Sequence, residues 1–264
     1  MTSNILFCGD ASMTDGVLIA TLSLMRQTRH PLHIFILTAT LTVKGHHYQP
    51  FAAETAERMA KLMQAQNPEH QLTRIDITEQ FLANPPLANM GTMFTPYCML
   101  RLYADLVPEL PDRVLYLDTD VICRRPFDAF YNQSMTDVDI AGVLDHYGKW
   151  WFHHRLAWFD YLNSGVLLMN LAHIREDGLL VRCRRLVRHR WLFMPDQSAL
   201  NIKLNSNESC RKNITNNISL NRIPSFNISR LFFVSGHIFG LSPSSLGRFR
   251  RCISSWDCMN MMIC

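Results

Sequence analysis

The sequence lacks a hydrophobic run that approaches the roughly 18 consecutive apolar residues needed to span a membrane. Its first residues lack the basic and then apolar stretches of a secretory signal, so we expect a cytoplasmic protein. The eight cysteines form no C-x-x-C pair and no metal-finger spacing, which favours scattered, reduced thiols. Aromatic and basic residues do not alternate as on nucleic-acid-binding surfaces, so no nucleic-acid partner is expected.

The 264 residues are 48% apolar, which is enough to bury a large core. Short apolar runs predict strands, and segments with apolar residues three or four apart predict helices. The expected strands cover residues 4–8, 33–38, 72–77, 113–117, 139–144 and 165–171. The expected helices cover residues 16–26, 51–66, 95–106, 172–190 and 197–204. This alternation predicts an α/β fold with a mainly parallel central sheet flanked by helices.

The composition changes near residue 205. Residues 205–264 contain eleven Ser, against six in all of residues 1–204, and seven Lys or Arg against two Asp or Glu. They show no sustained helical or strand period. We therefore predict a domain over residues 1–204 and an atypical, poorly ordered tail over residues 205–264. A loss of the reading frame near residues 203–206 is one hypothesis for the change.

Two carboxylates, Asp118 and Asp120, follow the apolar run of residues 113–117. On a strand, side chains two residues apart point to the same side, so both carboxylates would meet at the strand's carboxyl end. Two close anions repel each other unless a cation lies between them, and oxygen ligands favour Mg²⁺ or Mn²⁺. The pair is thus a candidate site for a metal and a diphosphate-bearing substrate.

Two other interpretations of this pair stay open. It could be a solvated acidic turn at the end of a strand. It could also belong to a phosphatase in which Asp118 attacks phosphate and Asp120 acts as general acid. The phosphatase would also need a downstream lysine, for which the sequence offers no clear candidate, and its nucleophile would normally lie near the start of the domain.

Further polar residues occur in a fixed order around the acidic pair. Asp10 follows the first strand, Arg101 lies on the helix before the pair, Asn163-Ser164 precede a later strand, and Asp196-Gln197 open a helix. In this order the segments resemble the retaining glycosyltransferases of family 8, which include bacterial lipopolysaccharide galactosyl- and glucosyltransferases. The resemblance covers about residues 4–204 and does not extend to the tail.

The resemblance implies a nucleotide-diphosphate-sugar binding fold of the GT-A type and dependence on Mn²⁺ or Mg²⁺. Asp118 and Asp120 match the metal-binding pair of the family, with Asp120 the more direct ligand on the diphosphate side. Asp10 matches the acid that contacts the uracil or ribose. The family often has a second acid beside it, and Ala11 at that position suggests weaker contacts with the nucleotide.

The remaining matches concern the sugar. Arg101 matches an arginine near the donor sugar and diphosphate, and Asn163 and Ser164 lie on the sugar side. Asp196 and Gln197 match the pair that flanks the anomeric carbon, so the resemblance makes Gln197, Asp196 and Asn163 the candidate catalytic residues. Whether the acceptor attacks from the front face or through a double displacement stays open.

Simpler structural roles compete with these assignments. Arg101 could be a surface cation paired with Asp105 four residues later. Asn163 could cap a turn, and Asp196 could be a helix N-cap. The arginines of the helix over residues 172–190 are expected to form a solvated face; they are Arg182, Arg184, Arg185 and Arg188.

The sequence departs from the family near its end. Family members carry a late His, followed by a Lys-Pro-Trp segment, as third metal ligand and diphosphate clamp. Here His237 is a candidate third ligand by position, but no Lys-Pro-Trp follows it.

The resulting prediction is a metal-dependent retaining enzyme that moves a hexose from a UDP-sugar to a hydroxyl of a bacterial surface glycan or glycolipid. UDP-glucose and UDP-galactose are the expected donors, and a peripheral contact with the inner membrane surface is left open. The alternative is a nucleotide-sugar-binding protein with impaired catalysis, which would result from the loss of the C-terminal ligand segment.

Overall fold

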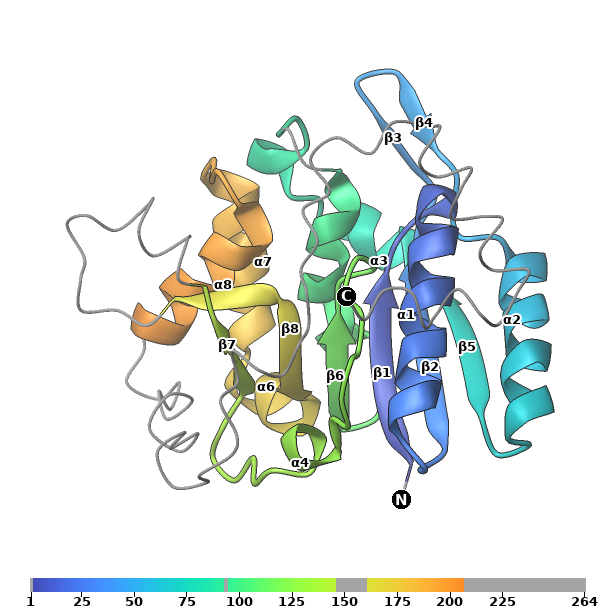
Figure 1. Cartoon of the computed structure of the whole chain (residues 1–264). Coiled ribbons are helices and arrows are strands. Elements are labelled where there is room, and N and C mark those ends of the chain that lie inside the picture. The colour runs from blue at the N-terminus through green and yellow to red at the C-terminus, as the bar shows by residue number, and fades with distance from the viewer. Residues whose placement is uncertain (1, 93–94, 146–160, 207–264) are drawn as a thin grey trace. The chain divides into compact units, whose positions relative to one another are not determined.

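The computed structural model describes residues 2–92, 95–145 and 161–206, which all lie in one compact unit, Met1–Val234. Its centre is a six-stranded sheet in the order β5-β2-β1-β6-β8-β7 (Figure 1). Neighbouring strands pair in parallel from β5 to β6, and β8 is antiparallel to both β6 and β7. The mainly parallel sheet is therefore confirmed. The strands are β1 (Ser3–Cys8), β2 (Leu32–Thr38), β5 (Gln71–Asp76), β6 (Arg113–Leu117), β7 (Ile140–Leu144) and β8 (Leu162–Asn170).

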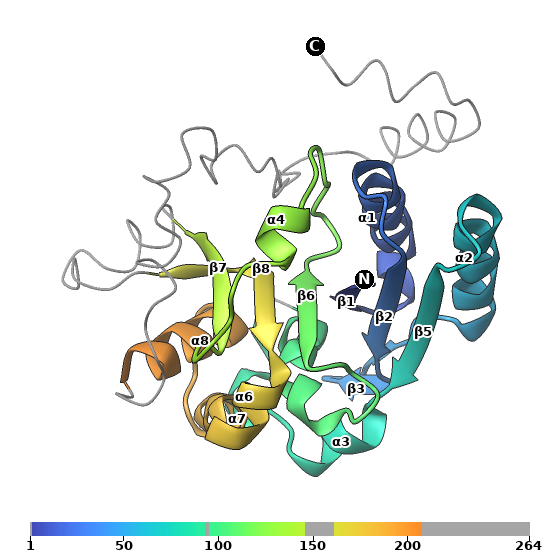
Figure 2. The ribbon, with the colours of Figure 1, turned by 90° about the horizontal axis from the view of Figure 1, so that it is seen from below.

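Helices cover both faces of the sheet (Figure 2). On one face lie α1 (Thr14–Gln27) and α2 (Ala53–Gln66). On the other lie α3 (Thr78–Ala83), the 3₁₀ helix η3 (Pro96–Leu106), α6 (Leu171–Asp177), α7 (Leu179–His189) and α8 (Pro195–Ser206). Because the central strands are covered on both sides, they are mostly apolar; β1 and β2 read SNILFC and LHIFILT. None of the described helices is both long and apolar enough to cross a membrane.

Several local predictions were wrong in detail. Residues 172–190 form two helices, because Gly178 adopts a left-handed conformation (φ 71°) that ends α6. Residues 96–106 form a 3₁₀ helix, in which Pro96 occupies the first position. The hairpin of β3 (Leu41–Val43) and β4 (His46–Tyr48) and the short elements η1 (Ala11–Met13), α3, η2 (Leu87–Asn89) and α4 (Asp128–Tyr131) were not predicted.

The antiparallel direction of β8 places the start of that strand beside the carboxyl end of β6. Leu117 pairs with Val166, and the amide of Asp118 donates a hydrogen bond to the carbonyl of Gly165 at 2.9 Å. A parallel strand would instead have brought its carboxyl end to this edge. The topology therefore brings Asn163 and Ser164 close to the acidic pair.

Candidate active site

Asp118 is held in a fixed orientation at the end of β6. The phenol of Tyr116, two residues earlier on the same side of the strand, donates to Asp118 Oδ1 at 2.6 Å. Tyr116 is fully buried, and burial, followed by the Asp118 charge, raises its pKa well above the ordinary value, so the phenol remains a donor. Asp118 Oδ2 makes no hydrogen bond within the described residues and is the oxygen that is left for a ligand.

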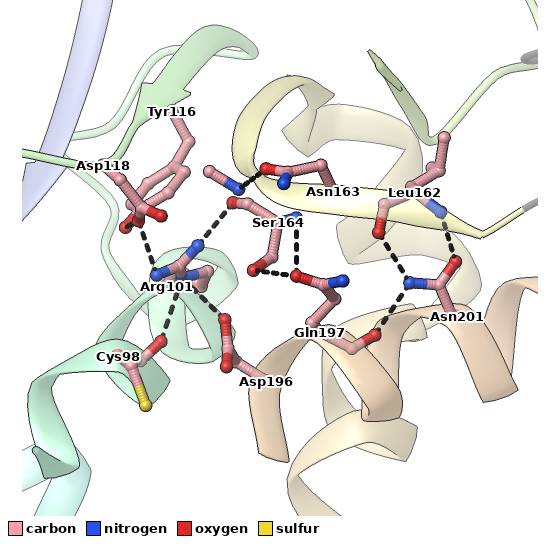
Figure 3. A network of polar contacts seen from close by, with 11 residues as sticks. Cys98, Arg101, Tyr116, Asp118, Leu162, Asn163, Ser164, Asp196, Gln197 and Asn201 are labelled. Atoms are coloured by element: carbon pink, nitrogen blue, oxygen red, sulfur yellow. Dashed lines mark hydrogen bonds and ion pairs between the residues drawn. The ribbon is translucent and has the colours of Figure 1, made fainter. Parts of the chain in front are cut away.

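Arg101, on η3, is the centre of the polar cluster (Figure 3). Its Nη2 lies 2.8 Å from Asp118 Oδ1, its Nε lies 3.4 Å from Asp196 Oδ2, and Nη1 donates to the carbonyl of Ser164. The guanidinium also covers the ring of Tyr116, 4.0 Å from its centroid. Burial alone would lower the pKa of Arg101, but the neighbouring acids, Asp118 first, raise it well above the ordinary value. A permanent buried cation thus joins three segments.

The simpler role considered for Arg101 is wrong. Only 4% of its side chain is exposed, and its ionic partners are Asp118 and Asp196. Asp105 pairs instead with Arg184 of α7, whose Nη2 lies 2.9 Å from Asp105 Oδ2. Arg184 is itself buried, so the predicted solvated face of α7 does not include it.

A tight turn brings β8 against Asp118. The side chain of Asn163 accepts a hydrogen bond from the amide of Gly165 at 2.7 Å, so Asn163 does cap a turn. A Cβ atom at Gly165 would lie 2.7 Å from Asp118 Oδ2 and 2.9 Å from Asn163 Oδ1. Only glycine leaves space for these two side chains to approach each other over the strand.

The first turn of α8 completes the cluster. Asp196 and Gln197 are buried, at 6% exposure each, so Asp196 is more than a solvated helix cap. Gln197 Oε1 accepts from the amide of Ser164 at 3.3 Å and from its hydroxyl at 3.2 Å. Gln197 Nε2 donates to Asp145 Oδ2 at 2.8 Å. The orientation of the Gln197 amide is therefore defined by donors on one side and an acceptor on the other.

Two further predicted residues, Asp10 and Asp120, follow strands β1 and β6 at the same edge of the sheet. Asp10 follows β1, is buried, and accepts from the amide and hydroxyl of Ser12 at 2.9 and 2.5 Å. Asp120 is exposed, one residue beyond Thr119. The close packing of Thr119 on Gly16, where a Cβ would lie 2.5 Å from the Thr119 carbonyl, fixes the loop against α1.

The side chains at this edge are of the chemical type that binds a hard divalent cation. Asp118 Oδ2 and the Asp120 carboxylate are oxygen ligands of the type that Mg²⁺ and Mn²⁺ prefer. The described part of the chain contains no group of three or more His, Cys, Asp or Glu side chains that could hold a metal ion. The predicted third ligand, His237, lies outside the described residues.

Three members of the site were not predicted: Tyr116, Asp145 and Asn201. Asn201 binds both the amide and the carbonyl of Leu162, at 2.7 and 2.9 Å, and so joins α8 to the start of β8. The two-residue spacing of Tyr116 and Asp118 could have revealed the first contact. Nothing in the sequence near Asp145 points to Gln197, 52 residues away.

The chain matches the sequence pattern of glycosyl transferase family 8 over residues 4–221. The match therefore continues past residue 204, where the resemblance was expected to end.

Similar curated proteins include glucoside xylosyltransferase 1 of Gallus gallus, which is 28% identical over 118 residues. Lipopolysaccharide glucosyltransferase WaaO of Escherichia coli (strain K12) is 30% identical over 112 residues. These alignments cover 39% and 38% of this chain, but only 26% and 33% of the relatives. The chain thus spans about a quarter to a third of the length of these two proteins.

Solved structures share the fold at lower sequence identity. The galactosyltransferase LgtC, in complex with donor and acceptor sugar analogs, superposes with a TM-score of 0.55 at 18% identity, over 75% of this chain and 70% of that one. Mouse xyloside xylosyltransferase 1 gives a TM-score of 0.53 at 14% identity, over 79% and 83% of the two chains. The predicted GT-A type of fold is confirmed by these glycosyltransferase structures.

Proposed function

Because the chain belongs to glycosyl transferase family 8, we propose that it transfers a hexose from a UDP-sugar to a hydroxyl group of a bacterial surface glycan or glycolipid. The observation that carries this proposal is the convergence of Asp118, Arg101, Ser164 and Gln197 at the carboxyl edge of β6. Ligands of open α/β sheets bind beyond this edge. The similar WaaO, named a lipopolysaccharide glucosyltransferase, supports an acceptor of lipopolysaccharide type.

In this proposal Asp118 and Asp120 hold Mn²⁺ or Mg²⁺, with Asp120 nearer the diphosphate. The ion, when bound, neutralises the charge that builds up on the departing diphosphate. Arg101 and Tyr116 both bind Asp118 Oδ1, which turns Oδ2 toward the ligand side. Asp10, buried at the end of β1, contacts the nucleoside.

The sugar is expected to lie between β8 and α8. The Asn163 oxygen is occupied by the Gly165 amide, so the Asn163 Nδ2 group is the part that can reach a sugar hydroxyl. Gln197 Oε1 already accepts two hydrogen bonds from Ser164, and an amide oxygen is a poor nucleophile. We therefore favour front-face attack, with the leaving phosphate as base and with Gln197 and Asp196 as groups that position the reacting carbon.

A donor screen tests the proposal. The full chain is incubated with UDP-glucose, UDP-galactose and UDP-xylose, with and without Mn²⁺, and release of UDP is measured; the xylose donor is included because similar proteins are named xylosyltransferases. Asp120→Asn should abolish the Mn²⁺-dependent release. The matched control Asp112→Asn changes a carboxylate that is 77% exposed and pairs with Arg175, and should leave release unchanged.

The same screen distinguishes the alternative. Binding of UDP without release from any donor would favour a nucleotide-sugar-binding protein with impaired catalysis. Absence of UDP binding, with or without Mn²⁺, would contradict both. His237→Ala should weaken Mn²⁺-dependent UDP binding if His237 is the third ligand, and an unchanged affinity would remove it from the site.

A further inference from the structure

The segment from α7 to the start of α8 is basic and contains no acid. Residues 179–195 include five Arg and one His but no Asp or Glu. Arg182 pairs with Asp177, and the buried Arg184 pairs with Asp105. The other three arginines are Arg185, Arg188 and Arg190. They form no ion pair within the described part of the chain, and their side chains are exposed or half-buried.

Large apolar side chains protrude next to these cations. Trp191 is 63% exposed and Phe193 is 38% exposed, directly after α7. Leu87, on η2, is 59% exposed. Single exposed apolar residues are ordinary, but a tryptophan and a phenylalanine two residues apart beside these arginines form a distinct surface.

A buried asparagine holds this surface together. Asn89 Nδ2 donates to the carbonyls of Val187 and Arg190 at 2.6 and 2.8 Å, and Asn89 Oδ1 accepts from the amide of Leu192 at 2.8 Å. These bonds fix η2 against the end of α7 and satisfy the backbone on both sides of Trp191. The exposed aromatic residues therefore stand on a rigid support.

We propose that this surface docks on an anionic phospholipid bilayer. The basic-aromatic patch consists of Arg185, Arg188, Arg190, Trp191, Phe193 and Leu87. Arginines attract anionic headgroups, while tryptophan and phenylalanine insert at the boundary between headgroups and acyl chains. Nucleic acid would satisfy the cations but would offer no apolar phase for Leu87, so the exposed aliphatic residue favours lipid.

Docking through this patch would also orient the candidate site. Phe193 precedes Asp196 by three residues, and α8 leads from the patch directly into the polar cluster. In Figure 1 the connection between α7 and α8 lies toward the edge of the sheet to which β1 and β6 point. The bilayer surface would then lie close to the end of the molecule that receives the acceptor. Lipid binding is measured without a donor, so its outcome is independent of sugar transfer.

The test is sedimentation of the full chain with two kinds of vesicle, one of pure phosphatidylcholine and one of phosphatidylcholine with about 30% phosphatidylglycerol. The anionic lipid gives the second kind a surface potential of about −30 to −50 mV. We expect binding to the anionic vesicles only, and weaker binding at high salt. The double variant Arg185→Gln/Arg190→Gln should bind the anionic vesicles about tenfold more weakly, because the loss of each cation near the membrane surface lowers the affinity severalfold. Trp191→Ala should also weaken binding severalfold.

Matched controls lie on the opposite face of the sheet. Arg29→Gln/Lys61→Gln removes two exposed cations near α1 and on α2, and Leu62→Ala removes a side chain that is 47% exposed. Both should bind vesicles like the wild type. Equal loss in variants and controls, or no loss in either, would overturn the proposal. So would retention on heparin or single-stranded DNA that depends on the patch, if the vesicles are not bound.

Discussion

The guanidinium of Arg101 binds the Asp118 carboxylate at 2.8 Å and lies on the ring of Tyr116. One buried cation thus sets the position of the first carboxylate of the acidic pair. Since Arg101 also contacts Asp196 and the carbonyls of Cys98 and Ser164, it joins η3 and the ends of β6, β8 and α8. Stability and donor binding should therefore both depend on Arg101.

Arg101→Lys should lower both quantities. Lysine keeps the charge but has a single donor head, which cannot reach Asp118, Asp196 and the Ser164 carbonyl together. Because Arg101 and Asp196 are buried, while Asp118 is partly exposed, we expect a loss of about 2–3 kcal/mol in the free energy of unfolding. Denaturant titration gives this value, and calorimetry with UDP and Mn²⁺ gives donor binding. Arg185→Lys, on the exposed side of α7, is the matched control; a silent Arg101→Lys would remove Arg101 from the site.

Gly165→Ala should displace the Asp118 carboxylate by a steric clash, without changing any charge or hydrogen-bonding group. The added Cβ would lie 2.7 Å from Asp118 Oδ2, the oxygen assigned to the metal, so the carboxylate or the strand has to move. We expect a cost of about 1–3 kcal/mol in stability and a clear loss of Mn²⁺ affinity, measured by calorimetry. At Gly91 the added Cβ meets only the flexible end of Lys44, and Gly91→Ala should have little effect. Unchanged Mn²⁺ affinity in Gly165→Ala would contradict the role of Asp118 Oδ2.

Much of this site could be predicted because its residues follow or precede apolar runs. Asp10 and Asp118 end parallel strands, and period-two geometry puts Tyr116 and Asp118 on one side of β6. The sequence cannot show which strands are antiparallel, and it is the reversed direction of β8 that brings Ser164 to the same edge. The convergence of the four segments was therefore predicted only through the family resemblance.

Other features depend on tertiary contacts that leave no local signal. Arg184 has the spacing of a solvated helix residue, yet it is buried against Asp105, 79 residues earlier. Gly178 lies inside a continuous helical pattern, and only its left-handed backbone shows that α6 ends there. The link between Asp145 and Gln197 likewise joins segments that are distant in sequence.

The stability of the fold should also depend on pH through His173. Its Nδ1 lies 2.7 Å from Asp139 Oδ1, and Asp139 is fully buried, with no hydrogen-bond partner for Oδ2 among the described residues. The hydrogen bond to Asp139 raises the pKa of His173, burial opposes this, and Asp177 and Glu176 add to the increase. A raised pKa in the folded state means that this contribution is fully present below about pH 6.5 and is lost as the pH rises through the folded value.

His173→Gln should therefore lose more stability at pH values below about 6 than at alkaline pH. Denaturant titrations of wild type and variant across this range measure the difference. His189→Gln, at the exposed end of α7, serves as the control and should show no such trend. A constant difference between wild type and His173→Gln would mean that the charge of His173 does not contribute.

The last prediction concerns the pair Asp145 and Gln197, in which the amide of Gln197 donates to a carboxylate and its oxygen accepts from Ser164. In Gln197→Glu the bonds from Ser164 can persist, but two carboxylates then face each other. Their repulsion raises the pKa of one of them, so the variant should be destabilised at neutral pH and should recover as the pH falls. Asp145→Asn alone replaces the charged acceptor with an amide that can turn either its oxygen or its NH2 group toward Gln197, and it should lower turnover more than donor binding, because the Gln197 amide is then held less firmly in one orientation.

The double variant Asp145→Asn/Gln197→Glu exchanges the two partners and provides the decisive comparison. The introduced asparagine would offer its NH2 group to the new carboxylate, which would still accept from Ser164, so positions 145 and 197 again form a donor-acceptor pair. The stability of the double variant should therefore exceed the sum of the two single changes by about 0.5–3 kcal/mol, as measured in a double-mutant cycle by denaturant titration. Additive losses would show that the contact does not orient Gln197. A recovered stability with turnover still low would instead mean that the neutral amide of Gln197 itself takes part in positioning the donor.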